Sequence, residues 1–228
     1  MKNKKELVEQ ILKKYQTNIF NIDHVFINPK NTDKLIVFFA GAVNKYIMLS
    51  WFFDCIDYSM LFLKDSTFNC YTNGNYKYIV EHYMNMFNHT AFVGLSMGGI
   101  GALLLQENYN ISGLLSVDAY PTGSVTDEQV QVSLNKDKNS DCCFCIMSSN
   151  DAEDIVRQKQ IVKLLRSKKK PLFFEQSDKE YHLGFIPSRL SILNFVNFAI
   201  QRHKIIQASS SDSDKHKSNY LHESELWE

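Results

Sequence analysis

Short apolar runs alternate with amphipathic stretches along most of this chain. The apolar runs are continuous and only five to seven residues long, which is typical of strands buried on both faces of a sheet. These predicted strands span residues 35–40, 59–63, 90–94, 113–117, 142–148 and 171–176. Between them, apolar residues recur at helical spacing, which predicts helices at 46–56, 76–87, 97–107, 152–167 and 188–202.

The alternation of strand and helix predicts an α/β fold. Strands joined by helical crossovers form a mostly parallel, twisted sheet with helices on both faces. The N-terminal region adds an amphipathic helix at 4–15, followed by one or two short strands within 18–29. We therefore expect a single domain over residues 1–206.

Two polar segments interrupt this alternation. Residues 121–141 join two predicted strands without a clear helical pattern, and we expect a mobile loop near the site there. The segment 207–228 is rich in Ser, Asp and Lys and has too little apolar surface to fold alone. We expect it to be a flexible tail, or one that docks by its last apolar residues.

The charge balance excludes some partners. Lys plus Arg (25) equals Asp plus Glu (25), so no net field attracts a nucleic acid or an anionic membrane. No apolar run reaches the roughly 18 residues needed to cross a bilayer, and the N-terminus is amphipathic rather than a signal peptide. These features predict a cytoplasmic protein without a membrane span.

The five cysteines are an odd set, with three of them in one predicted strand. This pattern favours buried, reduced thiols over a disulfide framework. Cys142 and Cys145 have C-x-x-C spacing, but a strand directs these two side chains to opposite faces. We therefore predict no metal site there.

Residues 94–98, Gly-Leu-Ser-Met-Gly, form a G-x-S-x-G motif between a predicted strand and a predicted helix. In that context the serine lies on a sharp turn, where the flanking glycines leave room for the backbone and expose the hydroxyl. Ser96 is the predicted nucleophile. The alternative is a glycine-rich helix start that only packs tightly.

A serine nucleophile needs a base and an orienting carboxylate. His182 lies between the last predicted strand and the last predicted helix, and it is the predicted base, with a surface histidine as the alternative. Asp151 directly follows a strand and is the predicted acid, although it could instead cap the next helix. Asp118 and Asp154 remain alternatives for the acid.

Backbone N–H groups would hold the oxyanion of the reaction. Met97 follows the nucleophile and lies at a helix N-terminus, where N–H groups are free. The second donor is predicted to be Ala42, in the small-residue turn after the strand that ends at Ala40. The alternative for Ala42 is a tight turn without function.

These residues, taken in order, resemble the α/β-hydrolase superfamily over residues 33–203. The resemblance implies an α/β-hydrolase fold and an acyl-enzyme mechanism without a metal or an organic cofactor. The chain lacks a His before Gly41 and the long insertion after the sixth strand, so we expect a minimal lid and a small substrate. Residues 61–71 and 94–102 also resemble a branch found near bacterial surface-polysaccharide genes, which includes O-acetyltransferases.

Three functional hypotheses follow. The first is a serine-dependent hydrolase of a small acyl ester or thioester. The second is an O-acyltransferase that moves an acetyl group, with acetyl-CoA as donor, to a sugar hydroxyl of a surface polysaccharide. The third is a non-catalytic binding protein that has the same fold, since function resides in the site and not in the fold.

Overall fold

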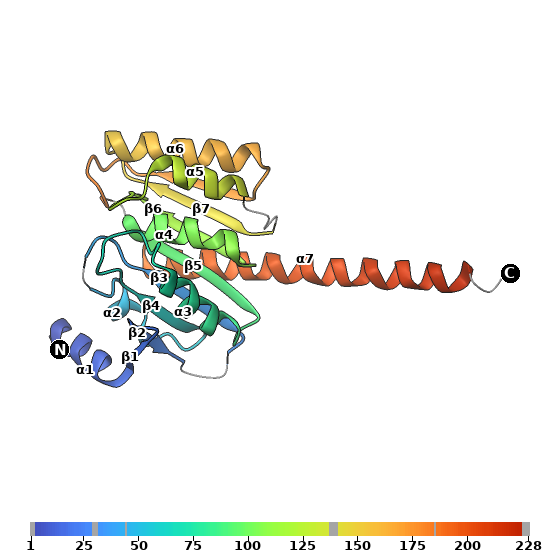
Figure 1. Cartoon of the computed structure of the whole chain (residues 1–228), viewed down its shortest axis with the longest axis horizontal. Helices are drawn as coiled ribbons and strands as arrows, with labels where there is room; N and C mark the ends of the chain where they lie inside the picture. Colours follow the sequence, from blue (N-terminus) through green and yellow to red (C-terminus); the bar gives the residue numbers. More distant parts are fainter. Residues whose placement is uncertain (1–2, 29–31, 44, 137–140, 185, 225–228) are drawn as a thin grey trace.

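An eight-stranded sheet runs through the described part of the chain (Figure 1). The computed structural model describes residues 3–28, 32–43, 45–136, 141–184 and 186–224, with side chains up to residue 209. The strands are β1 (Gln16–Ile19), β2 (Ile22–Ile27), β3 (Lys34–Phe39), β4 (Ser59–Leu63), β5 (His89–Leu95), β6 (Gly113–Val117), β7 (Cys143–Ser148) and β8 (Leu172–Gln176). The helices are α1 (Lys4–Tyr15), α2 (Leu49–Phe52), α3 (Gly74–Met84), α4 (Met97–Leu105), the 3₁₀ turn η1 (Gln106–Asn108), α5 (Asp127–Lys136), α6 (Ala152–Ser167) and α7 (Arg189–Ser224).

The sheet is parallel from β3 to β8, as the alternation predicted. Its strand order is β1-β2-β4-β3-β5-β6-β7-β8, and β2 joins as an antiparallel strand that pairs with β1 and β4. β3 pairs in parallel with both β4 and β5. After β3 the chain forms β4 on one side of β3 and then β5 on the other side, so the direction of strand order reverses between β3 and β5. In α/β sheets, ligands bind at the carboxyl ends of the strands at such a switch point.

Helices cover both faces of the sheet, which confirms the predicted layers (Figure 1). Alternate residues of β3 enter different cores: Val37 and Phe39 pack with α3, α4 and α6, whereas Ile36 and Phe38 pack with α1, α2 and α7. This alternation explains why β3 is a continuous apolar run, because both faces are covered. None of the helices within the described residues is long and apolar enough to cross a membrane.

The cysteines are buried thiols, and β7 separates the C-x-x-C pair as predicted. Cys142 belongs to one core and Cys145 to the other. Burial raises the pKa of the Cys143 thiol to about 11 and that of Cys145 to about 12. Both thiols are therefore protonated and unreactive at neutral pH.

Helix α5 corrects the prediction that 121–141 has no helix. Its N-terminus is a capping box, in which Thr126 N donates to Gln129 Oε1 (2.9 Å) and Gln129 N donates to Thr126 Oγ1 (3.3 Å). Val130 and Leu134, four residues apart, are buried. The T-x-x-Q pattern before apolar residues at helical spacing was the sequence signal for this helix.

Two other helices differ in length from the prediction. The helix expected at 46–56 is the single turn α2. The helix expected to end at residue 202 continues as α7 to Ser224 and extends away from the sheet (Figure 1). Adding a residue to an existing helix adds a hydrogen bond without a new nucleation cost, so a polar sequence can continue a helix that an apolar face has started. The predicted flexibility of 207–228 stays a prediction.

Candidate active site

Ser96 lies on the sharp turn between β5 and α4. Its backbone has φ 52° and ψ −123°, a conformation that costs a non-glycine residue about 1–3 kcal/mol. Gly94 and Gly98 make this turn possible, because a Cβ on Gly94 would collide with the Gly98 carbonyl and one on Gly98 with the Phe39 and Ala40 carbonyls. The G-x-S-x-G motif therefore forms the strand-to-helix turn that its context predicted.

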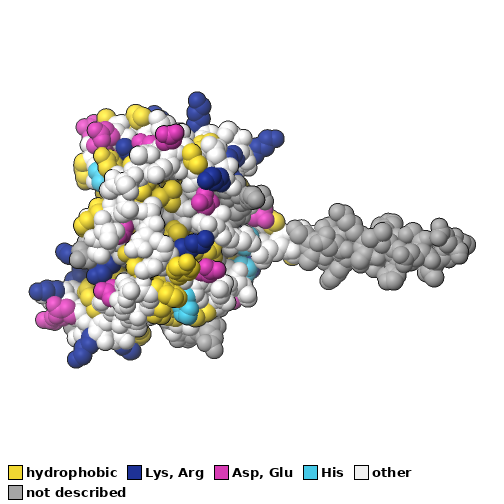
Figure 2. Space-filling model, viewed as in Figure 1, with side chains coloured by type: hydrophobic (Ala, Val, Ile, Leu, Met, Phe, Trp, Pro, Cys, Tyr) yellow, Lys and Arg dark blue, Asp and Glu magenta, His cyan; other side chains and the backbone are white. Residues whose placement is uncertain are grey.

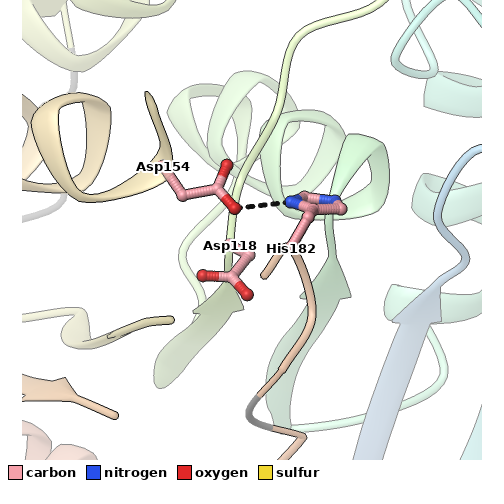
Figure 3. Close-up of side chains that lie close together, drawn as sticks. All are labelled: Asp118, Asp154 and His182. Carbon is pink, nitrogen blue, oxygen red and sulfur yellow. Dashed lines mark hydrogen bonds and ion pairs between the residues drawn. The ribbon is translucent and has the colours of Figure 1, made fainter. Parts of the chain in front are cut away.

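Ser96, His182 and Asp154 form one continuous series of hydrogen bonds. His182 Nε2 is 2.8 Å from Ser96 Oγ. His182 Nδ1 is 2.6 Å from Asp154 Oδ2, and this contact is the dashed line in Figure 3. An ionised carboxylate only accepts hydrogen bonds, so Nδ1 of the imidazole is the donor to Asp154. In the neutral imidazole this leaves Nε2 as the acceptor of the Ser96 hydroxyl proton.

The three side chains differ in exposure. The Asp154 side chain is 1% exposed, whereas that of His182 is 38% exposed. A buried carboxylate needs compensating donors, and Asp154 also has Ser149 Oγ at 3.4 Å and Arg157 Nη1 at 3.7 Å. The imidazole thus hydrogen-bonds to a buried acid through Nδ1, and the rest of the ring remains accessible to solvent.

Asp151, the acid predicted from the sequence, does not contact His182. Its Oδ1 accepts hydrogen bonds from the backbone N–H groups of Glu153 (3.1 Å) and Asp154 (3.3 Å), which makes it the N-cap of α6. The structure thus corrects the predicted partner of His182 from Asp151 to Asp154, one of the two alternatives. Asp151 follows β7 directly, but its carboxylate satisfies the free N–H groups of the helix start.

The sequence held a signal that favours Asp154. The buried positions of α6 follow helical spacing: Asp154, Gln158, Ile161, Val162 and Leu165. A carboxylate on the apolar face of a helix is costly unless it has a partner. Its place in that pattern therefore distinguished it from Asp151 at the cap.

Asp118, the other alternative acid, is fully buried beside the pair but contacts backbone N–H groups instead of the imidazole (Figure 3). Its Oδ1 accepts from Ser149 N (2.6 Å) and its Oδ2 from Leu183 N (2.8 Å). Burial raises the pKa of this carboxyl above its usual value, and the hydrogen bond from Ser149 N opposes the shift. Asp118 thus ties the residue after His182 to the carboxyl end of β6, and we expect it to position His182.

Asp118→Asn is expected to lower kcat about tenfold, because an amide NH₂ would face one of the two N–H donors and release the segment that carries His182. The loss should appear in kcat more than in KM, since the change displaces the group that hydrogen-bonds to Ser96. Steady-state kinetics on a nitrophenyl ester would measure both. Asp178→Asn, a change at an exposed residue of the same region, is the control. Wild-type kcat in Asp118→Asn would refute the positioning role.

The predicted oxyanion donors belong to two segments that adjoin Ser96. Met97 is the first residue of α4. Gly41, the neighbour of Ala42, passes so close to the nucleophile that a Cβ on it would lie 3.4 Å from Ser96 Cβ. The Tyr71 hydroxyl donates to the Ala40 carbonyl (2.9 Å) and fixes the start of this turn. Sequence analysis did not identify Tyr71, because its partner is thirty-one residues away in the chain.

Two hollows flank the site. One, of about 480 Å³, lies beside Leu95 and is lined by parts of α1, α2 and the turn after β3. The other, of about 540 Å³, is lined by Tyr120, His182 and the N-terminus of α6. The Tyr120 ring meets the His182 ring edge-on at 5.7 Å. The first hollow therefore adjoins the residue before Ser96, and the second opens onto His182.

Asp118, Asp154 and His182 are the group of described side chains whose spacing could hold a metal ion. Their ligand atoms lie within 4.8 Å of one another. Both Asp118 oxygens already accept backbone N–H groups, and Asp154 Oδ2 accepts from His182. These hydrogen bonds account for the arrangement of the three side chains.

No protein-family model and no curated protein sequence matches this chain. Several solved structures do match it. One is the capsule O-acetyltransferase of Neisseria meningitidis serogroup A, at 15% identity and a TM-score of 0.59, over 81% of this chain and 96% of that one. Esterase B from Lactobacillus rhamnosis matches at 9% identity and 0.57, over 82% and 84%. Acyl-protein thioesterase 2 from Zea mays matches at 10% identity and 0.55, over 79% and 98%. At such identities the likeness establishes a shared fold.

Proposed function

We propose that this chain, which has the α/β-hydrolase fold, is a serine-dependent hydrolase of a small acyl ester or thioester. The observation that carries the proposal is the hydrogen-bond series from Ser96 Oγ through His182 to Asp154. Nucleophile, base and orienting acid stand within hydrogen-bond reach of one another, which is the geometry that nucleophilic catalysis requires. A merely structural role does not need a serine on a strained turn.

In the first half-reaction, His182 Nε2 takes the proton of the Ser96 hydroxyl while Oγ forms a bond to the substrate carbonyl carbon. The N–H groups of Met97 and Ala42 stabilise the negative charge on the carbonyl oxygen. The bond to the leaving alcohol or thiol then breaks, and this group leaves with the proton from His182. Asp154 holds the imidazolium in place during these steps.

In the second half-reaction, a water molecule attacks the acyl-serine. His182 takes the water proton and returns it to Ser96 Oγ, which releases the acid. The exposure of the His182 side chain supports this step, because water reaches the ring from the hollow beside Tyr120.

Acyl transfer to a sugar hydroxyl is the second candidate. The acyl-enzyme is the same, and an alcohol takes the place of water. The hollow beside His182 supports it, because Asp151 and Glu153 line that hollow and their carboxylates can accept hydrogen bonds from sugar hydroxyl groups. The match to a capsule O-acetyltransferase adds to this. Acetyl-CoA as the donor and a cytoplasmic location stay predictions.

A fluorophosphonate probe tests the proposal. Ser96 Oγ is expected to displace fluoride from the probe, and mass spectrometry should place the label on the peptide that contains Ser96. Heat-denatured protein should not react, because the reaction needs His182 in place. Ser167→Ala is a matched control, since Ser167 is an exposed serine at the end of α6 that lines neither hollow, and it should label like wild type. Native protein without label, or with label elsewhere, would favour the non-catalytic binding protein.

A further inference from the structure

The hollow beside Leu95 has apolar walls. Val8 and Leu12 come from α1, Met48 and Trp51 from the start of α2, and Leu95 directly precedes the nucleophile. The Trp51 side chain is 38% exposed. Exposed apolar surface inside a concave site is what an apolar part of a ligand would cover.

Three lysines from three different elements line the same hollow. Lys4 belongs to α1, Lys45 follows β3 and Lys64 follows β4, whereas none of the described lining residues is acidic. Lys64 Nζ lies 5.1 Å from the centre of the Tyr46 ring, which also lines the hollow. Figure 2 shows basic side chains, with acidic ones among them, on the surface near the end of the molecule where α1 lies. Such a group of ammonium charges attracts an anion.

The hollow adjoins the reacting serine. A Cβ on Gly41 would lie 3.4 Å from Ser96 Cβ and 3.7 Å from Ile47 Cδ1, and Ile47 lines the hollow. Ile186, four residues after His182, lines it as well. A molecule in this hollow can therefore present a carbonyl to Ser96.

The second hollow has the opposite charge. Asp151, Glu153 and Asp154 line it beside His182. An anion is repelled there and attracted on the side of Leu95. The two hollows thus fix the direction in which a charged substrate lies across Ser96.

We propose that the hollow beside Leu95 selects acyl esters or thioesters that carry an anionic group, with their apolar part on α1 and α2 and the anion at Lys45 and Lys64. This inference rests on the proposed function of Ser96. The anion can be a phosphate on the leaving group or a carboxylate on the acyl group, since both offer oxygens to an ammonium group. Lys4 adds charge at the rim.

The test compares wild type with Lys45→Met/Lys64→Met, which keeps the apolar stems and removes the charges. The substrates are butyryl-coenzyme A, the p-nitrophenyl monoester of glutaric acid, and neutral p-nitrophenyl valerate. We expect kcat/KM for at least one anionic substrate to fall about tenfold at low salt, through KM, with the neutral ester unchanged. The substrate that responds identifies the position of the anion. Lys163→Met, at an exposed lysine of α6, is the control.

A binding measurement separates this inference from the proposed function. Trp51 fluorescence in a Ser96→Ala/Trp227→Phe background, in which Trp51 is the single tryptophan, reports occupancy without turnover. Kd for butyryl-coenzyme A or the glutarate monoester should rise about tenfold in the double lysine variant. Lysine-dependent binding without labelling of Ser96 would refute the hydrolase and keep the anion site. The opposite outcome is a wild type that is labelled and active, together with a lysine variant whose kcat/KM values for anionic and neutral substrates equal those of wild type. This outcome would refute the anion site alone.

Discussion

Asp154→Asn is expected to lower kcat about 10⁴-fold and to leave KM nearly unchanged. Asp154 Oδ2 is the acceptor for His182 Nδ1 at 2.6 Å, and this bond sets which ring nitrogen carries the proton. With Nδ1 protonated, Nε2 can take the proton of Ser96. Loss of the carboxylate removes both this preference and the stabilisation of the imidazolium.

The surroundings of Asp154 determine how an asparagine would orient there. Arg157 Nη1 lies 3.7 Å from Oδ1 and can only donate. The oxygen of the substituted amide would therefore face Arg157, and its NH₂ group would face His182. Nδ1 would then become an acceptor and Nε2 would carry the proton. In that tautomer the imidazole cannot act as the base for Ser96.

Asp151→Asn is the matched control, because it makes the same change three residues earlier. Asparagine caps helices about as well as aspartate, so stability should hold. The kcat for hydrolysis of a neutral nitrophenyl ester, which needs no contact with the Asp151 carboxylate, should stay within about threefold of wild type. Asp151→Ala should lower the free energy of unfolding by about 1 kcal/mol, again with kcat retained. Steady-state kinetics and urea denaturation measure both effects. A large loss of kcat in Asp151→Asn, with activity in Asp154→Asn, would restore Asp151 as the acid.

Much of the fold could be predicted because its signals are local. The apolar run before Gly41 and the runs at 59–63 and 113–117 match β3, β4 and β6 closely, since parallel strands covered on both faces must be apolar throughout. The likeness to a solved esterase at 9% identity confirms the fold that the resemblance implied. Helix α5 was not predicted because the polar composition of its segment indicated a loop, and the T-x-x-Q capping box at its start was not taken into account.

The candidate site could be predicted only in part. Ser96 and His182 were chosen from a motif and from chain order, and the structure brings them within 2.8 Å of each other. The choice among Asp118, Asp151 and Asp154 depends on which way each side chain points, and distance along the chain does not determine that. Asp118 has φ 43°, a positive value that nothing in the sequence predicts. Its contact with Leu183 N joins residues sixty-five positions apart.

Ser96→Ala is expected to lower kcat by a factor on the order of 10⁶, because the acyl-enzyme can no longer form. Ser96→Gly should lose as much activity and yet differ in stability. Alanine retains the Cβ that makes φ 52° and ψ −123° unfavourable, whereas glycine reaches this conformation freely.

The glycine variant should therefore be more stable than the alanine variant by about 1 kcal/mol, once the greater freedom of glycine in the unfolded chain is counted. Urea denaturation of the two inactive proteins measures this difference without reference to any substrate. Equal stability, or a more stable alanine variant, would mean that the turn holds no strain at residue 96. A covalent acyl adduct on either variant, both of which lack the Ser96 hydroxyl, would refute Ser96 as the nucleophile. The stability and activity readouts are independent, because strain belongs to the backbone of the turn and nucleophilic attack belongs to Oγ.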